Sequence, residues 1–167
     1  TGLTEEDRSA IDRSAGSIPI LAAANFSLAV HVLNGLCTKA AAQLGDDYDI
    51  EILEAHHRFK TDAPSGTALT LARNICEATG RSFEADVVCT RHGNDVPRQP
   101  RQITVQALRL GDHTGEHTAY FAALGERIEL RHVSTSRDSY ARGALHAAGW
   151  VAGKPAGRYD MRDLLGP

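Results

Sequence analysis

The stretch formed by residues 54–68, EAHHRFKTDAPSGTA, gathers most of the side chains in this sequence that could perform chemistry. Two histidines stand next to each other at His56 and His57, and Lys60 follows three residues later. A histidine can donate a proton near neutral pH because its unperturbed pKa is about 6.5. A lysine is a fixed cation that binds carboxylates well. The spacing therefore predicts a site for a small, carboxylate-bearing molecule that receives a proton.

The same stretch contains the predicted start of a helix at Ser65, Gly66 and Thr67. Free amides and the helix dipole favour an anion at such a start. Gly66 allows a ligand to approach the backbone, and the Thr67 hydroxyl adds a donor. Each feature also has a structural interpretation, since paired histidines are often structural and Ser-Gly-Thr is often only a helix cap. Their concentration within one short loop favours a site.

Regular elements must position this loop. Residues 49–57 alternate as a strand that ends at the two histidines, which should point to opposite faces unless the strand has already ended. Helices are predicted over residues 4–16, 27–44, 65–79 and 138–152 from their caps, apolar spacing and closing glycines. The apolar positions of the second helix are Leu28, Val32, Leu36, Ala40 and Leu44.

The second half of the chain has the pattern of strands. Residues 103–110, 116–124 and 127–134 alternate and are separated by glycine-containing turns, which predicts an antiparallel meander. A short strand is expected within residues 17–23, and the tail 157–165 is expected to be extended or a short helix. The predicted fold class is α+β, with helices covering one face of a mixed sheet. The other face is expected to carry Thr104, Gln106, His117, Glu129 and Arg131, and to mediate oligomerisation.

Composition narrows the class of protein. The 167 residues are 42% hydrophobic and 23% charged with a net charge of −3, which fits one globular domain and gives no broad electrostatic case for nucleic acid or anionic membrane. No apolar run approaches the roughly 20 residues that span a bilayer. Cys37, Cys76 and Cys89 show no C-x-x-C spacing and are expected to be buried free thiols in a reducing cytoplasm. Because the sequence does not begin with Met, we expect a piece of a longer chain.

The stretch 54–68 resembles the signature of the 4-hydroxy-tetrahydrodipicolinate reductase (dihydrodipicolinate reductase) family, E-x-H-H-x-x-K-x-D-A-P-S-G-T-A. The pattern is long and mixed in residue type, so it is specific. The resemblance covers nearly the whole chain, through short segments at residues 1–3, 24–27, 111–118, 125–132 and 159–163.

The resemblance implies roles for individual residues. His56 matches the histidine that protonates the substrate carbon after hydride delivery, and Lys60 matches the lysine that holds a substrate carboxylate and supports that transfer. Further substrate contacts are implied at His57, Ser65, Gly66, Thr67 and Thr1. The segment that approaches the nicotinamide in the family is matched by Ala24, Asn25 and Phe26.

The family reduces a cyclic unsaturated imine dicarboxylate with NADH or NADPH, in diaminopimelate and lysine biosynthesis. The resemblance further implies a four-stranded mixed sheet whose open face joins three other subunits in a homotetramer. The sequence lacks the G-x-G-x-x-G turn of a Rossmann domain. We therefore expect residues 1–23 to be the end of that domain, residues 24–150 to bind substrate and oligomerise, and residues 151–167 to pack back toward the cofactor-domain side. Alone, the chain is not expected to turn over efficiently, and its preference for NADH or NADPH is left open.

The sequence also leaves two alternatives open. The missing glycine-rich turn is compatible with an inactive, self-associating binding module. The spacing of His113 and His117 suggests a zinc hydrolase, but these residues fall in a strand and turn region and no H-E-x-x-H pattern accompanies them, so no metal is expected.

Overall fold

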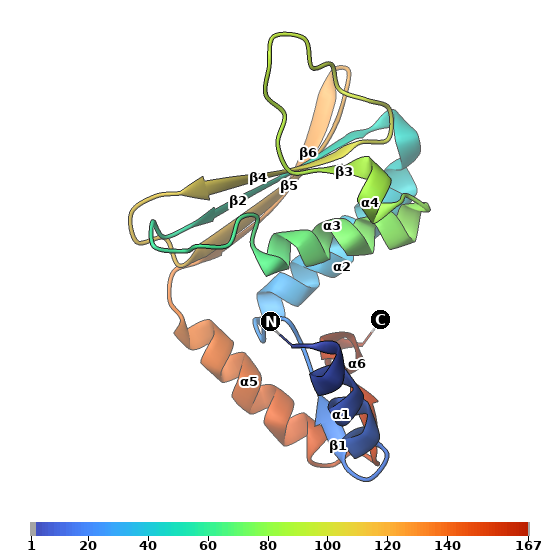
Figure 1. Ribbon diagram of the computed structural model, residues 1–167, viewed down its shortest axis with the longest axis vertical. Coiled ribbons are helices and arrows are strands. Elements are labelled where there is room, and N and C mark those ends of the chain that lie inside the picture. Colours follow the sequence, from blue (N-terminus) through green and yellow to red (C-terminus); the bar gives the residue numbers. More distant parts are fainter. Residues whose placement is uncertain (1–2, 167) are drawn as a thin grey trace. The chain divides into compact units, whose positions relative to one another are not determined.

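The strand that ends at His56, β2 (Asp49–His56), lies at the centre of a mixed sheet (Figure 1). The computed structural model describes residues 3–166, and within them the sheet has the order β3-β4-β2-β5-β6. This sheet belongs to a compact unit formed by residues 32–136, whereas residues 3–31 and 137–166 form a second unit. The whole stretch 54–68 therefore lies within the sheet unit.

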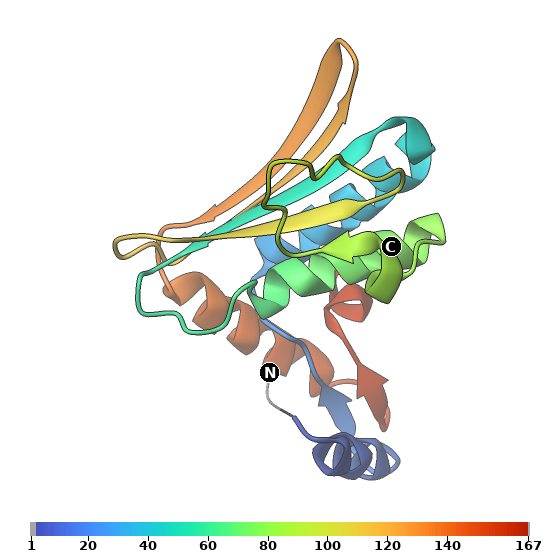
Figure 2. The same ribbon diagram turned by 45° about the horizontal axis from the view of Figure 1, so that its top comes forward.

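Strand β2 has neighbours of opposite direction. It pairs parallel with β4 (Ile103–Arg109) and antiparallel with β5 (Gly115–Ala123). Strand β6 (Glu126–Ser134) forms a hairpin with β5, which Figure 2 shows at the sheet edge, and the short β3 (Val87–Val88) pairs parallel with β4.

The expected meander is therefore wrong for β4 and β5, because β2 lies between them. The alternating patterns identified each strand but carried no information on strand order. Ile50 and Ile52 of β2 are about 1% exposed. Apolar side chains of this kind favour a central strand, which has a neighbour on each side.

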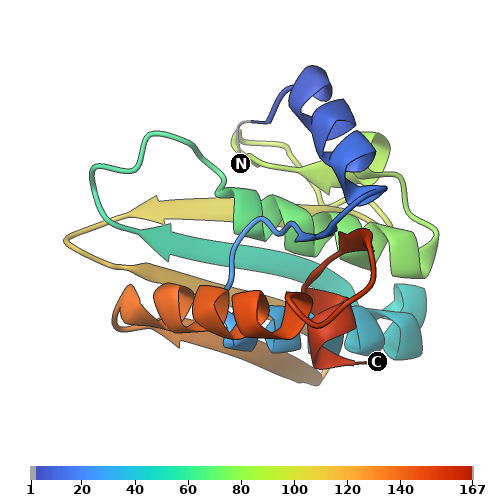
Figure 3. The ribbon, with the colours of Figure 1, turned by 90° about the horizontal axis from the view of Figure 1, so that it is seen from below.

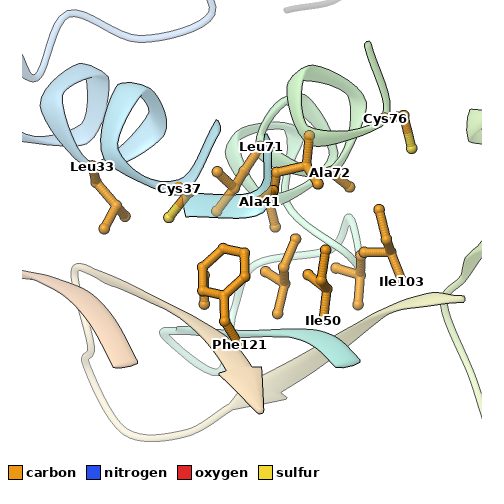
Figure 4. Close-up of a cluster of buried hydrophobic side chains, with 14 residues drawn as sticks. Leu33, Cys37, Ala41, Ile50, Leu71, Ala72, Cys76, Ile103 and Phe121 are labelled. Carbon is orange, nitrogen blue, oxygen red and sulfur yellow. The ribbon is translucent and has the colours of Figure 1, made fainter. Parts of the chain in front are cut away.

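Two helices, α2 (Leu28–Leu44) and α3 (Gly66–Thr79), cover one face of the sheet, as predicted. Figure 4 shows the core between the two helices and the sheet, where helix side chains pack against strand side chains. The labelled members of this cluster are Leu33, Cys37, Ala41, Leu71, Ala72 and Cys76 from the helices and Ile50, Ile103 and Phe121 from the strands.

The buried face of α2 differs in part from the predicted one. Leu33, Cys37 and Ala41 face the core, whereas Val32 and Leu36 of the predicted series are about half exposed, at 51% and 50%. Ala40 and Leu44 of that series are partly buried against the core, as predicted. The helix is apolar over much of its circumference. Both the series Val32, Leu36, Ala40 and the series Leu33, Cys37, Ala41 could therefore face the sheet. Packing against the sheet, rather than periodicity, selected the buried series.

Short elements and caps complete the sheet unit. Helix α3 begins at the N-cap Ser65 and ends at Gly80, which has a φ of 62°, as predicted. A 3₁₀ turn, η1 (Gly45–Asp47), follows α2, and helix α4 (Phe83–Asp86) precedes β3. Cys37 and Cys76 are buried as expected, but Cys89 is exposed because β3 ends one residue before it.

The other unit is built from both ends of the chain. Helix α1 (Glu5–Ala15) leads into β1 (Pro19–Leu21), and the C-terminal part contributes α5 (Asp138–Val151), β7 (Gly157–Tyr159) and α6 (Met161–Leu165). Strands β1 and β7 pair in parallel. The tail thus forms both a strand and a short helix.

Gly143 of α5 packs directly on the backbone of Phe26, one of the residues expected near the nicotinamide. A Cβ atom at position 143 would lie 1.7 Å from the Phe26 carbonyl oxygen, a distance that no real contact reaches. The segment around Phe26 is also shaped by its neighbours, since Ser27 N donates to Asn25 Oδ1 at 3.0 Å and His31 Nε2 lies 2.9 Å from Asn25 O. Glycine at 143 is therefore required for this packing.

We predict that Gly143→Ala destabilises the chain by about 1–3 kcal/mol, because overpacking forces the backbone to move. Gly149→Ala in the same helix is the matched control, since a Cβ at position 149 meets nothing within 4 Å. That change is expected to stabilise by roughly 0.5–1 kcal/mol, because alanine is the better helix former. Urea unfolding of the two variants measures the difference, and equal stabilities would contradict the packing argument.

Candidate active site

The end of β2 places Glu54 and His56 on the same face of the sheet, because side chains two residues apart in a strand point in the same direction. His56 Nδ1 lies 2.6 Å from Glu54 Oε2. The His56 side chain is 12% exposed, whereas that of Glu54 is completely buried. A histidine with one nitrogen bound to a buried carboxylate is held in a defined orientation and keeps Nε2 for other partners.

Glu54 is surrounded by donors from three segments. Arg109 of β4 binds it with two nitrogens, at 2.9 Å to Oε2 and 2.8 Å to Oε1, and the amide of Ser65 donates to Oε1 at 2.9 Å. Burial by itself raises the pKa of this carboxyl group, but hydrogen bonds from His56, Arg109 and Ser65 outweigh it and lower the pKa to about 2. Glu54 is therefore a carboxylate at neutral pH.

Arg109 reaches this position because β4 runs parallel to β2. Arg109 is paired in register with His56, and Figure 3 shows β2 and β4 ending at the same edge of the sheet. The guanidinium group also donates to the carbonyl oxygen of Asp62 at 2.5 Å, which ties β4 to the loop that carries Lys60. Arg109 was not among the site residues predicted from the sequence. The signal that could have found it is a charged residue at the C-terminal end of a second alternating run.

Three histidine rings lie in a row on this face. The centroids of His56 and His117 are 5.3 Å apart with an edge-on geometry, and those of His117 and His132 are 6.3 Å apart. Burial lowers the pKa of His117 to about 4, helped by the charges of His56 and His132. Burial also lowers the pKa of His132.

The position of His117 corrects the prediction that it lies on the open face. It is paired in register with Glu54 and has the same parity in β5 as the core residues Ala119 and Phe121. Strict alternation would have placed it with them. Of the five residues expected on the open face, the other four lie there by register, namely Thr104, Gln106, Glu129 and Arg131.

Ser65 connects the carboxylate to the histidine row. Its hydroxyl oxygen accepts from the amide of Ala68 at 3.2 Å and lies 3.3 Å from His117 Nε2. Gly66 and Thr67 form the first turn of α3 beside it. The Gly66 amide has no acceptor inside the helix because first-turn amides lack one.

Lys60 and His57 lie in the loop after β2. The Lys60 ammonium binds both oxygens of Asp62, at 2.7 and 2.9 Å, and this contact lowers the pKa of the Asp62 carboxyl group. The positive charge of Lys60 also lowers the pKa of His117, so the lysine lies within electrostatic reach of the histidine row. The His57 ring lies 6.4 Å from that of Phe59, and its buried Nδ1 has no hydrogen-bond partner among the described residues.

The remaining predicted site residues are outside the sheet unit. Ala24, Asn25 and Phe26 belong to the unit formed by residues 3–31 and 137–166, and Thr1 lies outside the described residues. The structure thus brings together His56, Ser65 and Gly66 with Glu54, Arg109 and His117.

Within residues 3–166, no group of three or more His, Cys, Asp or Glu side chains is arranged to hold a metal ion. His113 instead pairs with Glu116 at 3.3 Å. None of the described helices combines the length and hydropathy needed to span a bilayer.

Comparison with known proteins gives a consistent result. The family model for the C-terminus of dihydrodipicolinate reductase matches residues 29–165. A 4-hydroxy-tetrahydrodipicolinate reductase from Myxococcus xanthus is 52% identical over 166 residues, which are 99% of this chain and 61% of that protein. The same-named protein of Pseudoalteromonas translucida is 49% identical and is covered to 62%.

Among solved structures, the dipicolinate-bound dihydrodipicolinate reductase of Paenisporosarcina sp. TG-14 matches with a TM-score of 0.71 and 25% identity. The match covers 96% of this chain and 60% of that one. The chain therefore spans less than two thirds of the length of these relatives.

We predict that His117 makes the stability of the chain depend on pH between about 6.5 and 4. In this range the unfolded chain binds a proton at position 117 that the folded chain does not, so stability is present above pH 6.5 and is lost as pH falls toward 4. The loss is about 3 kcal/mol at one such site. His117→Gln should flatten the pH dependence in urea unfolding, while His92→Gln, at an exposed position, should leave it unchanged. An unaltered slope in His117→Gln would contradict the prediction.

Proposed function

Because the chain belongs to the dihydrodipicolinate reductase family, we propose that it serves the NAD(P)H-dependent reduction of 4-hydroxy-tetrahydrodipicolinate to tetrahydrodipicolinate. This reaction belongs to diaminopimelate and lysine biosynthesis. It consumes one hydride and one proton and releases water. In this proposal the chain supplies the substrate site and the proton. The observation that carries the proposal is the contact between His56 and the buried carboxylate of Glu54.

His56 is the proposed proton donor. Glu54 can only accept hydrogen bonds, so His56 Nδ1 carries a hydrogen in the contact with it. The protonated ring holds a second hydrogen on Nε2, and transfer of that hydrogen to a substrate carbon leaves a neutral ring still bound to Glu54. The donor therefore keeps its orientation before and after the transfer.

Lys60 and the start of α3 are the proposed carboxylate sites. The Lys60 side chain is 21% exposed and its ammonium group is bound to Asp62, whose side chain is 59% exposed, so a substrate carboxylate can take over part of this pairing. The first-turn amides at Gly66 and Thr67, with His57, are the proposed contacts for the rest of the dicarboxylate. The dipicolinate bound to the Paenisporosarcina protein is itself a small ring dicarboxylate, which supports this assignment.

NADH or NADPH supplies the hydride when bound. Within residues 3–166 no glycine-rich turn joins a strand to a helix in the way that holds a pyrophosphate. Most of the cofactor site is therefore assigned to a separate domain. The contribution proposed for this chain is the segment formed by Ala24, Asn25 and Phe26.

The division of the chain supports such a partner domain. A two-stranded parallel sheet like β1–β7 is too small to be stable by itself and normally continues a larger parallel sheet. We propose that residues 1–23 end a cofactor domain, that residues 24–150 bind substrate and oligomerise, and that residues 151–167 return to the cofactor-domain side. The pairing of β7 with β1 supports that return.

The expected homotetramer is proposed to use the open face of the sheet. Leu108 and Val133 are 45% and 44% exposed on this face, among polar neighbours such as Gln106 and Arg131. We expect sedimentation of the complete protein to give the mass of four chains. A monomer would contradict this part of the proposal.

The reaction itself is tested by NAD(P)H absorbance with the complete reading frame and with substrate generated in the cuvette. We expect substrate-dependent oxidation that falls about 10²- to 10⁴-fold in His56→Gln, because a general acid contributes that much. His146→Gln, on the exposed surface of α5, is the control and should retain full turnover.

Full activity in His56→Gln would remove the donor role. A folded protein that binds cofactor but oxidises none would instead favour the self-associating module.

A further inference from the structure

Of the three histidines in the row, His56 is the one whose ring nitrogen contacts a carboxylate among the described residues. His117 Nε2 faces the Ser65 hydroxyl, and the buried Nδ1 atoms of His117 and His132 have no hydrogen-bond partner within residues 3–166. A positive charge on the buried His117 ring would therefore have no hydrogen-bonded carboxylate among residues 3–166, and the half-buried His132 ring has no such contact there either. The contact with Glu54 therefore distinguishes His56 from the other two rings, and burial lowers the pKa of both of those.

The contacts of Glu54 keep its carboxylate ionised while His56 changes its charge. The side chain is completely buried, and its two oxygens receive hydrogen bonds from Arg109, from the Ser65 amide and from His56. The two bonds from Arg109 persist whether His56 is charged or neutral, since a guanidinium group stays protonated. Glu54 therefore has little tendency to remove the Nδ1 hydrogen when the ring gives up a proton.

We propose that Glu54, held by Arg109, is the positioning residue that keeps the hydrogen of His56 on Nδ1, so that Nε2 is the atom that delivers the proton. The inference rests on the proposed role of His56 as donor. The charged and titratable groups around His56 are Glu54, Arg109, which binds Glu54, and His117. His132 lies beside His117, and the charge of Lys60 lowers the pKa of His117. Glu54 itself does not contact the substrate in this arrangement.

The same strand offers a matched control. Glu51 also lies on β2 and also binds arginines, Arg91 at 3.2 Å and Arg98, as well as the hydroxyl of Thr104 at 2.9 Å. It lies on the opposite face of the sheet, paired in register with Thr104 and Tyr120. Glu51→Gln thus removes a charge from an arginine-bound glutamate of β2 without touching the histidine row.

The experiment compares Glu54→Gln, Glu51→Gln and His56→Gln in the complete protein. We expect Glu54→Gln to lower kcat by about 10- to 100-fold, a part of the 10²- to 10⁴-fold that a general acid supplies, with the substrate KM little changed. The alkaline limb of its pH–rate profile, where a general acid loses its proton, should move to lower pH. Histidine ¹⁵N spectra should show His56 losing its uniform Nδ1–H form. Glu51→Gln should match the parent protein in kcat, pH profile and histidine spectrum.

The outcomes separate this inference from the proposed function. An inactive His56→Gln together with a folded Glu54→Gln that keeps the parent kcat and Nδ1–H form would overturn the positioning role alone. A fully active His56→Gln would overturn both. If Glu54→Gln does not fold, Arg109→Lys takes its place, because a lysine keeps the charge but cannot make the bidentate hydrogen bonds to Glu54. The parent kcat and spectrum in Arg109→Lys would then overturn the inference.

Discussion

A carboxylate without access to water sits where β2 ends, and the arrangement of the site follows from its need for donors. A buried charge is costly unless it is paired and hydrogen-bonded. Glu54 meets this requirement with a guanidinium group from β4, an amide from the start of α3 and an imidazole from its own strand. The contacts from Arg109 and Ser65 fix β4 and the start of α3 against β2. The same interactions that make the burial of Glu54 possible also orient His56.

The mixed direction of the strands is what makes this arrangement possible. Because β4 is parallel to β2, Arg109 emerges at the same edge as His56. Because β5 is antiparallel to β2, its early residue His117 returns to that edge beside Glu54. The expected meander would have placed β4 next to β5 and moved Arg109 away from Glu54. Strand order therefore decides the chemistry of the site as directly as the residues of the loop do.

The two faces of the sheet have different proposed functions. The face covered by α2 and α3 carries the apolar core and, toward the end of β2, the histidine row. The open face carries ion pairs and half-exposed apolar side chains such as Leu108, which suit contact with other copies. Glu51 and Glu54, three residues apart on one strand, therefore belong to different environments although both bind arginine.

The sequence by itself determined what depends on neighbouring residues. Caps such as Ser65 and Gly80 set the ends of α3, alternation located the long strands, and the concentration of His56, Lys60 and Ser65 in one loop indicated the candidate site. The tertiary structure alone decided which face of α2 is buried, that β2 separates β4 from β5, and that Arg109 and His117 meet Glu54. These features depend on contacts between segments far apart in the chain. Local caps and periodicity act over a few residues, whereas strand order and register are set by the packing of the whole sheet.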